Sequence, residues 1–137
     1  MFQNNMNNPI GNNISFFEEI EQLGKGQFGE VHKMKSKINN QIYAVKFIKI
    51  PVDQNENIQY ENIKIFREKV IQSNISHPNI VKVYNTFSDN QYHYLVSEYV
   101  EGTNLESFVK IVKSQGGRIP QELIIKIFKQ ILNGIIY

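Results

Sequence analysis

The stretch LGKGQFGEV, residues 23–31, limits the fold of this chain more than any other part of the sequence. Gly24, Gly26 and Gly29 have the G-x-G-x-x-G spacing found in loops whose backbone N–H groups bind phosphates. In a dinucleotide-binding fold the third glycine opens a helix. Here residues 29–36 have strand character, and an Asn-Asn pair that suits a hairpin turn follows them. The sequence therefore predicts a glycine loop at the tip of a β-hairpin, with ordinary turn glycines as the simpler alternative.

Hydrophobic periodicity and turn signals predict three strands, a helix, two strands and two helices, in that order. Pro51 ends the third strand and Pro78 ends the first helix. Thr103 or Asn104 is the expected N-cap of the next helix, and Gly116 lies just past its end. The strands are expected over residues 15–24, 29–36, 42–50, 80–87 and 92–100, and the helices over residues 63–75, 103–115 and 120–137.

Composition excludes several classes of function. The 15 lysine and arginine residues against 13 aspartate and glutamate residues give a net charge of +2, which predicts neither nucleic-acid nor membrane-surface binding. Cysteine is absent, His77 is a lone histidine in a turn, and His32 and His93 have no ligand-like spacing to each other or to acidic residues, so no metal site is expected. No apolar run is long enough to cross a bilayer and no secretory signal is visible. We expect an intracellular, cytoplasmic protein whose asparagine-rich residues 1–15 form a disordered tail.

Four segments in a fixed order give the chain a family resemblance. GKGQFGEV, YAVK, a helix containing REKVI, and HPNIV followed by YLVSEYVEG together resemble the N-terminal lobe of a eukaryotic-type protein kinase. The resemblance implies an α+β kinase domain over residues 16–137. Its N-lobe, residues 16–100, would be a five-stranded antiparallel sheet with a regulatory helix. A hinge over residues 98–103 and two helices of a truncated C-lobe over residues 104–137 would follow.

The resemblance implies that ATP is the ligand. The glycine loop would cover the phosphates with its bare backbone, and Leu23 and Val31 would form an apolar roof over the adenine. Ala44 is small enough to leave space for the ring. The residues that the resemblance assigns to ATP are Leu23, Gly24, Lys25, Gly26, Gln27, Phe28, Gly29, Val31, Ala44, Lys46, Val81, Ser97, Glu98, Val100 and Asn104.

Lys46 is the first candidate catalytic residue. A lone lysine in an apolar strand is usually an edge charge, but strand alternation places Lys46 on the same face as Ala44. The resemblance makes Lys46 the lysine that holds the α- and β-phosphates. Its carboxylate partner in the family lies nine residues before His77, which is Glu68, and Glu61 is the competitor.

Two further expectations concern the adenine side and the helix of Glu68. The carbonyl of Glu98 and the N–H of Val100 would bond the adenine, and Ser97 would leave an open pocket behind it. Asn104 would contact the ribose or simply cap a helix. Gln72 stands where the family has an apolar residue, which would make the active position of that helix less stable.

The family's catalytic and metal-binding loops are missing from the sequence. Neither His-Arg-Asp nor Asp-Phe-Gly occurs, so Mg²⁺, expected for the family, has no evident protein ligand here. We therefore expect a truncated domain that is inactive alone, with residues 121–137 forming an apolar helix for a partner or a missing C-lobe. The full enzyme would phosphorylate protein hydroxyls, and residues 98–124 bear a fainter resemblance to NIMA-related serine/threonine kinases. The alternative is a non-catalytic kinase-like protein that binds a nucleotide or a partner.

Overall fold

The computed structural model describes residues 10–26, 29–50 and 75–137 as two compact units. The first unit holds the chain up to Ile75 together with Lys82–Tyr99, and the second holds Ser76–Val81 and Val100–Tyr137. The described elements are η1 (Ile14–Phe16), β1 (Phe17–Gly26), β2 (Gly29–Ser36), β3 (Ile42–Lys49), β4 (Val83–Ser88), β5 (Tyr92–Glu98), α2 (Leu105–Ser114) and α3 (Gln121–Ile135).

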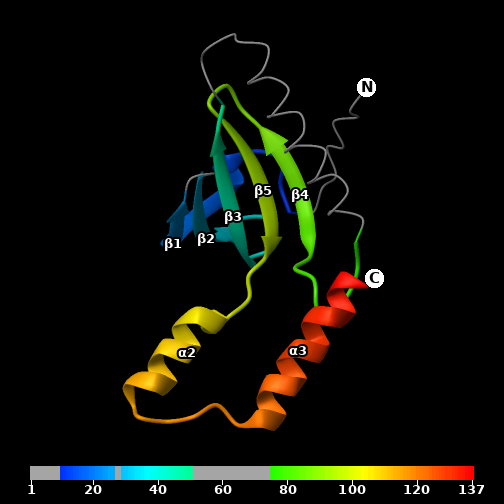
Figure 1. The fold of residues 1–137 in the computed structure, drawn as a ribbon. Coiled ribbons are helices and arrows are strands. Elements are labelled where there is room, and N and C mark those ends of the chain that lie inside the picture. Colours follow the sequence, from blue (N-terminus) through cyan, green and yellow to red (C-terminus); the bar gives the residue numbers. More distant parts are fainter. Residues whose placement is uncertain (1–9, 27–28, 51–74) are drawn as a thin grey trace. The chain divides into compact units, whose positions relative to one another are not determined.

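The first unit is an antiparallel sheet of five strands in the order β1-β2-β3-β5-β4 (Figure 1). Five strands followed by two helices confirm the predicted α+β fold. Each predicted strand and both later helices form within a few residues of the expected bounds, because local alternation and turn residues specify them. The predicted regulatory helix over residues 63–75 lies outside the described residues, apart from Ile75.

The turn between β2 and β3 uses the predicted Asn-Asn pair. Asn40 has φ +60°, a left-handed conformation that asparagine tolerates better than most residues. Its N–H donates to the Ser36 carbonyl, and the N–H of Ser36 donates to the Gln41 carbonyl, each at 2.9 Å. The pair therefore reverses the chain and aligns β3 against β2.

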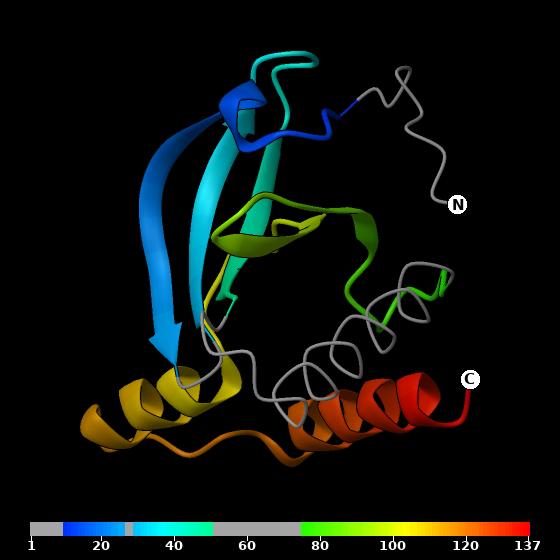
Figure 2. The same ribbon diagram turned by 90° about the horizontal axis from the view of Figure 1, so that it is seen from above.

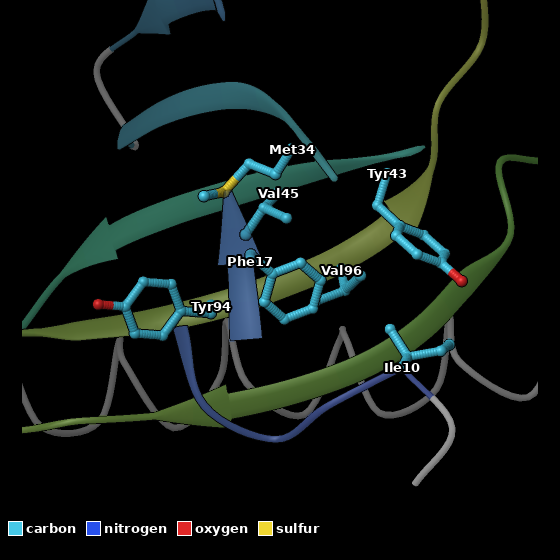
Figure 3. Packing of buried hydrophobic residues seen from close by; sticks show 7 residues of the cluster. All are labelled: Ile10, Phe17, Met34, Tyr43, Val45, Tyr94 and Val96. Atoms are coloured by element: carbon cyan, nitrogen blue, oxygen red, sulfur yellow. The ribbon is translucent and has the colours of Figure 1, made fainter. Parts of the chain in front are cut away.

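The hydrophobic core covers one face of the sheet. Val45 and Val96 are fully buried at its centre, and Phe17 packs edge-on against Tyr43 with ring centroids 6.3 Å apart. Figure 3 shows the side chains of this cluster gathered together on one side of the strands. Its members are Ile10, Phe17, Met34, Tyr43, Val45, Tyr94 and Val96.

The expected disordered tail is wrong at its described end. Ile10 is 8% exposed and belongs to the core cluster, and Ile14 packs against that cluster. Asn13 caps η1, because its side chain accepts a hydrogen bond from the N–H of Ser15. Composition suggested disorder because asparagine dominates this segment, whereas Ile10 and Ile14 pack with the core and the side chain of Asn13 caps η1.

The second unit contains α2 and α3, joined by residues 115–120 (Figure 1). Asn104 is the N-cap of α2, since its side chain accepts from the N–H of Ser107 at 2.7 Å. Gly116 follows the helix with φ +69°. The predicted capping residues therefore mark both ends of α2.

The boundary between the units differs from the predicted lobe division at residues 76–81. We assigned this segment to the N-lobe, yet it groups with the helices. Gly134 of α3 approaches it so closely that an added Cβ would lie 3.2 Å from the carbonyl oxygen of Asn79. The rings of His77 and Tyr137 also lie 4.9 Å apart.

Many apolar side chains of α3 are exposed in the structure. Phe128 is 61% exposed and Ile135 is 73% exposed. The other exposed apolar residues of this segment are Ile124, Ile125, Ile131, Leu132, Ile136 and Tyr137. None of the helices in the described ranges has the length and apolar character needed to cross a membrane.

Candidate functional site

The three glycines of the β1–β2 hairpin have different surroundings. Gly29 has φ +126°, and a Cβ placed there would overlap the carbonyl oxygen of Phe47 on β3. Gly24 and Gly26 would meet no described atom within 4 Å if a Cβ were added. The packing of the sheet therefore requires Gly29. At Gly24 and Gly26 the described residues leave open space beside bare backbone.

Gly24 lies in the same row of the sheet as the candidate lysine. In the strand registers Gly24 is opposite Val31, Val31 is opposite Lys46, and Lys46 is opposite Leu95. Directly opposed residues point to the same face, so this row crosses four strands on one side of the sheet. Lys46 is half-buried, while Val45 beside it is fully buried in the core on the other face.

Ala44 and Ser97 form the centre of the next row on the same face. They are opposite each other between β3 and β5, and the Ser97 hydroxyl donates to the Ala44 carbonyl at 3.2 Å. Both side chains are small, so this part of the face carries little bulk. The pairing agrees with the predicted adenine position, but the ligand contacts of both residues stay predictions.

Glu98 ends β5, where the hinge is expected to begin. Its N–H donates to the Lys82 carbonyl at 2.9 Å, and its carboxylate accepts from the Lys82 N–H at 2.9 Å. These bonds fix the end of β5 beside the chain that enters β4. The boundary between the two units falls directly after Tyr99, within the expected hinge.

Lys33 connects the hairpin strands to this segment, and sequence reasoning missed it. Its Nζ lies 4.5 Å from the centroid of the Tyr99 ring and 3.3 Å from the Glu21 carboxylate. The interactions with Tyr99 and then Glu21 raise the pKa of the Lys33 ammonium. A lysine two positions after Val31 in β2 lies on the same face as Val31, which is the signal that could have identified it.

The other face of the hairpin carries a charged cluster that the sequence did not suggest. His32 is 9% exposed; its Nδ1 lies 2.8 Å from Glu19, and its Nε2 lies 3.4 Å from Glu30. Its ring centroid is 4.6 Å from that of Phe47. From the sequence His32 was considered only as a metal ligand, and these two carboxylate contacts were not predicted. Strand alternation places Glu30 beside His32, and pairing with β1 brings in Glu19.

Lys25 also belongs to this cluster. Its Nζ lies 2.7 Å from Glu30, and this hydrogen-bonded pair lowers the pKa of the Glu30 carboxyl and raises that of the Lys25 ammonium. In the described structure Lys25 thus has a carboxylate partner across the hairpin, and its predicted ligand contact stays a prediction.

Three predicted site residues belong to the second unit. Val81 is 45% exposed and Val100 is 64% exposed, and Asn104 caps α2 as described above. Nearby, Gly102 has φ +135°, a conformation that favours glycine. The cap interpretation of Asn104 is confirmed, and its ribose contact stays a prediction.

Part of the predicted site lies outside the described residues. This applies to Gln27 and Phe28 of the glycine loop, to Glu68 with its competitor Glu61, and to Gln72. The predicted ion pair between Lys46 and Glu68 is therefore not tested. Within the described ranges, no three histidine, cysteine, aspartate or glutamate side chains gather as they would around a metal ion.

Comparison with known proteins shows one consistent likeness. The sequence model of the protein kinase domain matches residues 17–137. The chain is 34% identical to mitogen-activated protein kinase kinase 2 of Arabidopsis thaliana over 126 residues, which cover 90% of this chain and 32% of that protein. It is 38% identical to calcium-dependent protein kinase 5 of Plasmodium falciparum over 127 residues, covering 90% and 20% of the two chains.

A third similar protein is cAMP-dependent protein kinase type 3 of Saccharomyces cerevisiae, 34% identical over 103 residues that cover 74% of this chain and 24% of that protein. The chain thus spans between 20% and 32% of the length of these curated relatives. None of the three is named as a NIMA-related kinase, and the comparisons do not support that subtype.

Proposed function

The chain belongs to the protein kinase family, and on that premise we propose that its first unit binds ATP as part of an enzyme that phosphorylates serine or threonine in proteins. One observation carries the proposal. Gly24 leaves bare backbone and open space at one end of a sheet row in which Lys46 is half-buried two strands away. Backbone N–H groups and an ammonium on one face are the groups that bind phosphates.

Different described residues would contact the phosphates and the adenine of ATP. The N–H groups of the glycine loop and the ammonium of Lys46 would compensate the charge of the triphosphate. The small Ala44 and Ser97 would leave a flat surface for the adenine, and the backbone of Glu98 would supply a hydrogen bond to it. ATP would bring the phosphoryl group that is transferred. We assign no described residue to Mg²⁺, because no suitable ligand cluster occurs among them.

Phosphoryl transfer to a protein needs groups beyond those of the nucleotide site. His-Arg-Asp and Asp-Phe-Gly do not occur in the 137 residues. We therefore expect this 137-residue chain to bind nucleotide without transferring phosphate. An intracellular location, where ATP is present, belongs to the same proposal. The second candidate function is non-catalytic binding of a partner, which the exposed apolar residues of α3 favour.

The test is a titration of the 137-residue chain with a fluorescent ATP analogue. We expect Lys46→Met to weaken binding about tenfold or more while leaving the thermal unfolding temperature unchanged, because it removes one charge-assisted contact worth about 1.5–3 kcal/mol. Lys49→Met is the matched control, since Lys49 lies on the same strand as Lys46 but is exposed. Equal binding by wild type and both variants would contradict the phosphate role of Lys46.

The substrate class needs a separate measurement. In a full-length kinase that contains this chain, transfer of labelled γ-phosphate to a generic protein substrate, followed by phosphoamino-acid analysis, distinguishes serine and threonine from tyrosine, and labelled phosphotyrosine alone would contradict the proposed substrate class. We expect no transfer by the 137 residues alone. Robust transfer by a clean preparation of this chain would show that a catalytic base exists among residues to which we give no such role.

A further inference from the structure

The segment before β1 is bound to the sheet in a way that the family likeness does not account for. The protein kinase match begins at residue 17, yet residues 10–16, here called the strap, are docked on the core face of the first unit. Figure 2 shows the strap running beside the turn that joins β2 and β3. Ile10 is 8% exposed and shares the core cluster with Tyr43 and Val96.

Two side chains from separate strands bind the backbone of the strap. The Ser36 hydroxyl, at the end of β2, donates to the Ile10 carbonyl at 3.1 Å, and Ser36 is 0% exposed. The Asn85 amide, at the register shift in β4, donates to the Gly11 carbonyl at 2.7 Å. A buried apolar side chain flanked by hydrogen bonds to main-chain carbonyls is a combination that proteins use to recognise peptide segments.

The conformation of the strap also restricts its sequence. Gly11 has φ +102°, and an added Cβ would lie 2.9 Å from Cβ of Phe16. Beyond this bend, the Phe16 carbonyl accepts from the N–H of Lys37 at 2.8 Å, and the Ser15 carbonyl accepts from Lys37 Nζ at 2.8 Å. The strap is thus fixed at both of its ends, with a glycine between them.

We propose that the core face of the sheet carries a peptide-binding site, formed by Ser36, Asn85, Tyr43 and Val96, whose occupant is the chain's own strap. The ligand class is a peptide segment with an aliphatic residue followed by glycine. Because β2 and β4 are not neighbours in the sheet, the occupied site connects the β2–β3 turn to the far edge strand. The strap therefore stabilises the whole sheet, including the strands that carry the proposed nucleotide face.

The first experiment displaces the strap from the site in the full chain and then tests whether an added peptide binds there. Gly11→Val should lower the thermal unfolding temperature by about 5 °C or more, whereas Asn12→Ala, an exposed neighbour, should not. The folded Gly11→Val chain should bind a fluorescein-labelled, acetylated peptide of residues 10–16, IGNNISF, saturably, and wild type should bind it at least about tenfold more weakly. Adding Asn85→Ala should abolish that binding, and Asn90→Ala, in the β4–β5 turn, should not. An unchanged unfolding temperature, or no peptide binding by the folded variant, would overturn the proposal.

A second measurement keeps the proposal testable if Gly11→Val does not fold. Hydrogen exchange of the wild-type chain should show the Lys37 amide, which donates to Phe16, protected at least about tenfold relative to an unstructured peptide. The Phe16 amide donates to the Asn13 carbonyl within the strap at 3.1 Å. Asn85→Ala should reduce the protection of this amide, and Asn90→Ala should leave it unchanged. Exchange of both amides at the unstructured rate in wild type would overturn the proposal.

Discussion

At the scale of single residues, the glycines of the G-x-G-x-x-G motif have different surroundings, so replacing them is expected to have different consequences. Gly29 is fixed by its positive φ and by the carbonyl of Phe47, whereas Gly24 and Gly26 have open space where a side chain would be. A requirement that comes from the chain's own packing affects stability. A requirement that comes only from a ligand affects binding and leaves the fold unchanged.

The glycines can therefore be separated by experiment. Gly29→Ala should destabilise the chain by about 2 kcal/mol or more, because alanine is strained at this φ and its methyl group overlaps backbone. Gly24→Val should leave the unfolding temperature nearly unchanged and weaken binding of the fluorescent ATP analogue. Chemical denaturation and nucleotide titration of both variants check the pair. Equal destabilisation by both substitutions would contradict the distinction.

Ser97 gives a second prediction at this scale. A larger side chain at Ser97 would project over the small Ala44, which lies directly opposite it. Ser97→Met should weaken inhibitors that extend behind the adenine by about tenfold or more and affect ATP far less, because only the former need the space. Ser88→Met, on the edge strand β4, is the control. Equal loss of affinity for both ligands in a competition titration would refute the role assigned to Ser97.

At the scale of elements, polar side chains stabilise the β1–β2 hairpin and the β4–β5 hairpin in different ways. The β1–β2 hairpin has the cluster of Lys25, Glu30, His32 and Glu19, and the β4–β5 hairpin depends on Asp89. The Asp89 carboxylate accepts from the N–H groups of Gln91 and Tyr92 and, at 2.6 Å, from the Tyr94 hydroxyl. The geometry of the β4–β5 turn thus depends on Asp89, whose side chain accepts hydrogen bonds from the backbone of the same turn.

The Asp89 contacts predict a pH dependence of stability. The hydrogen bond from Tyr94, and then those from the backbone of Gln91 and Tyr92, lower the pKa of Asp89 in the folded chain. The stabilisation is therefore complete above the unfolded pKa of about 3.9. It is lost as the pH falls through the lower folded pKa.

Asp89→Asn should consequently lower the unfolding temperature at pH 7, and the difference from wild type should shrink toward pH 3. Thermal unfolding followed by circular dichroism across this range measures it. Glu18→Gln, an exposed carboxylate on β1, should give no comparable trend. A difference that stays constant with pH would show that the charge of Asp89 is not responsible.

At the scale of the whole molecule, the two units bury their apolar residues to different extents. The first has a core with fully buried Val45 and Val96, whereas no residue of α2 or α3 is classed as buried. Exposed apolar surface of this extent favours association. Residues of α3 that share an exposed face are therefore expected to drive contact between copies of the purified chain.

That expectation gives a prediction for α3. Phe128→Lys and Ile135→Lys should each shift the purified chain toward the monomer, because each replaces an exposed apolar side chain by a charge. Sedimentation velocity as a function of concentration measures the change, with Lys126→Arg on the same helix as the control. A wild-type chain that is monomeric throughout, or variants that associate as before, would contradict it.

The sequence alone predicted the five strands, the two later helices, the Asn-Asn turn and a helix cap at Thr103 or Asn104, because these depend on residues close together along the chain. It also pointed to the protein kinase family through short motifs. Tertiary structure alone decided the contacts between distant residues. Gly11 and Asn85 are separated by 74 positions, and no local pattern relates them.

The same reason explains the other corrections. The neighbours of His32 and the partner of Lys33 follow from how β1 and β2 are aligned, including the register shifts in that ladder. The different requirements of Gly24 and Gly29 depend on which backbone lies next to each, and only the folded sheet brings β3 against Gly29. Local preference specifies where elements form, whereas burial and strand register determine which side chains meet.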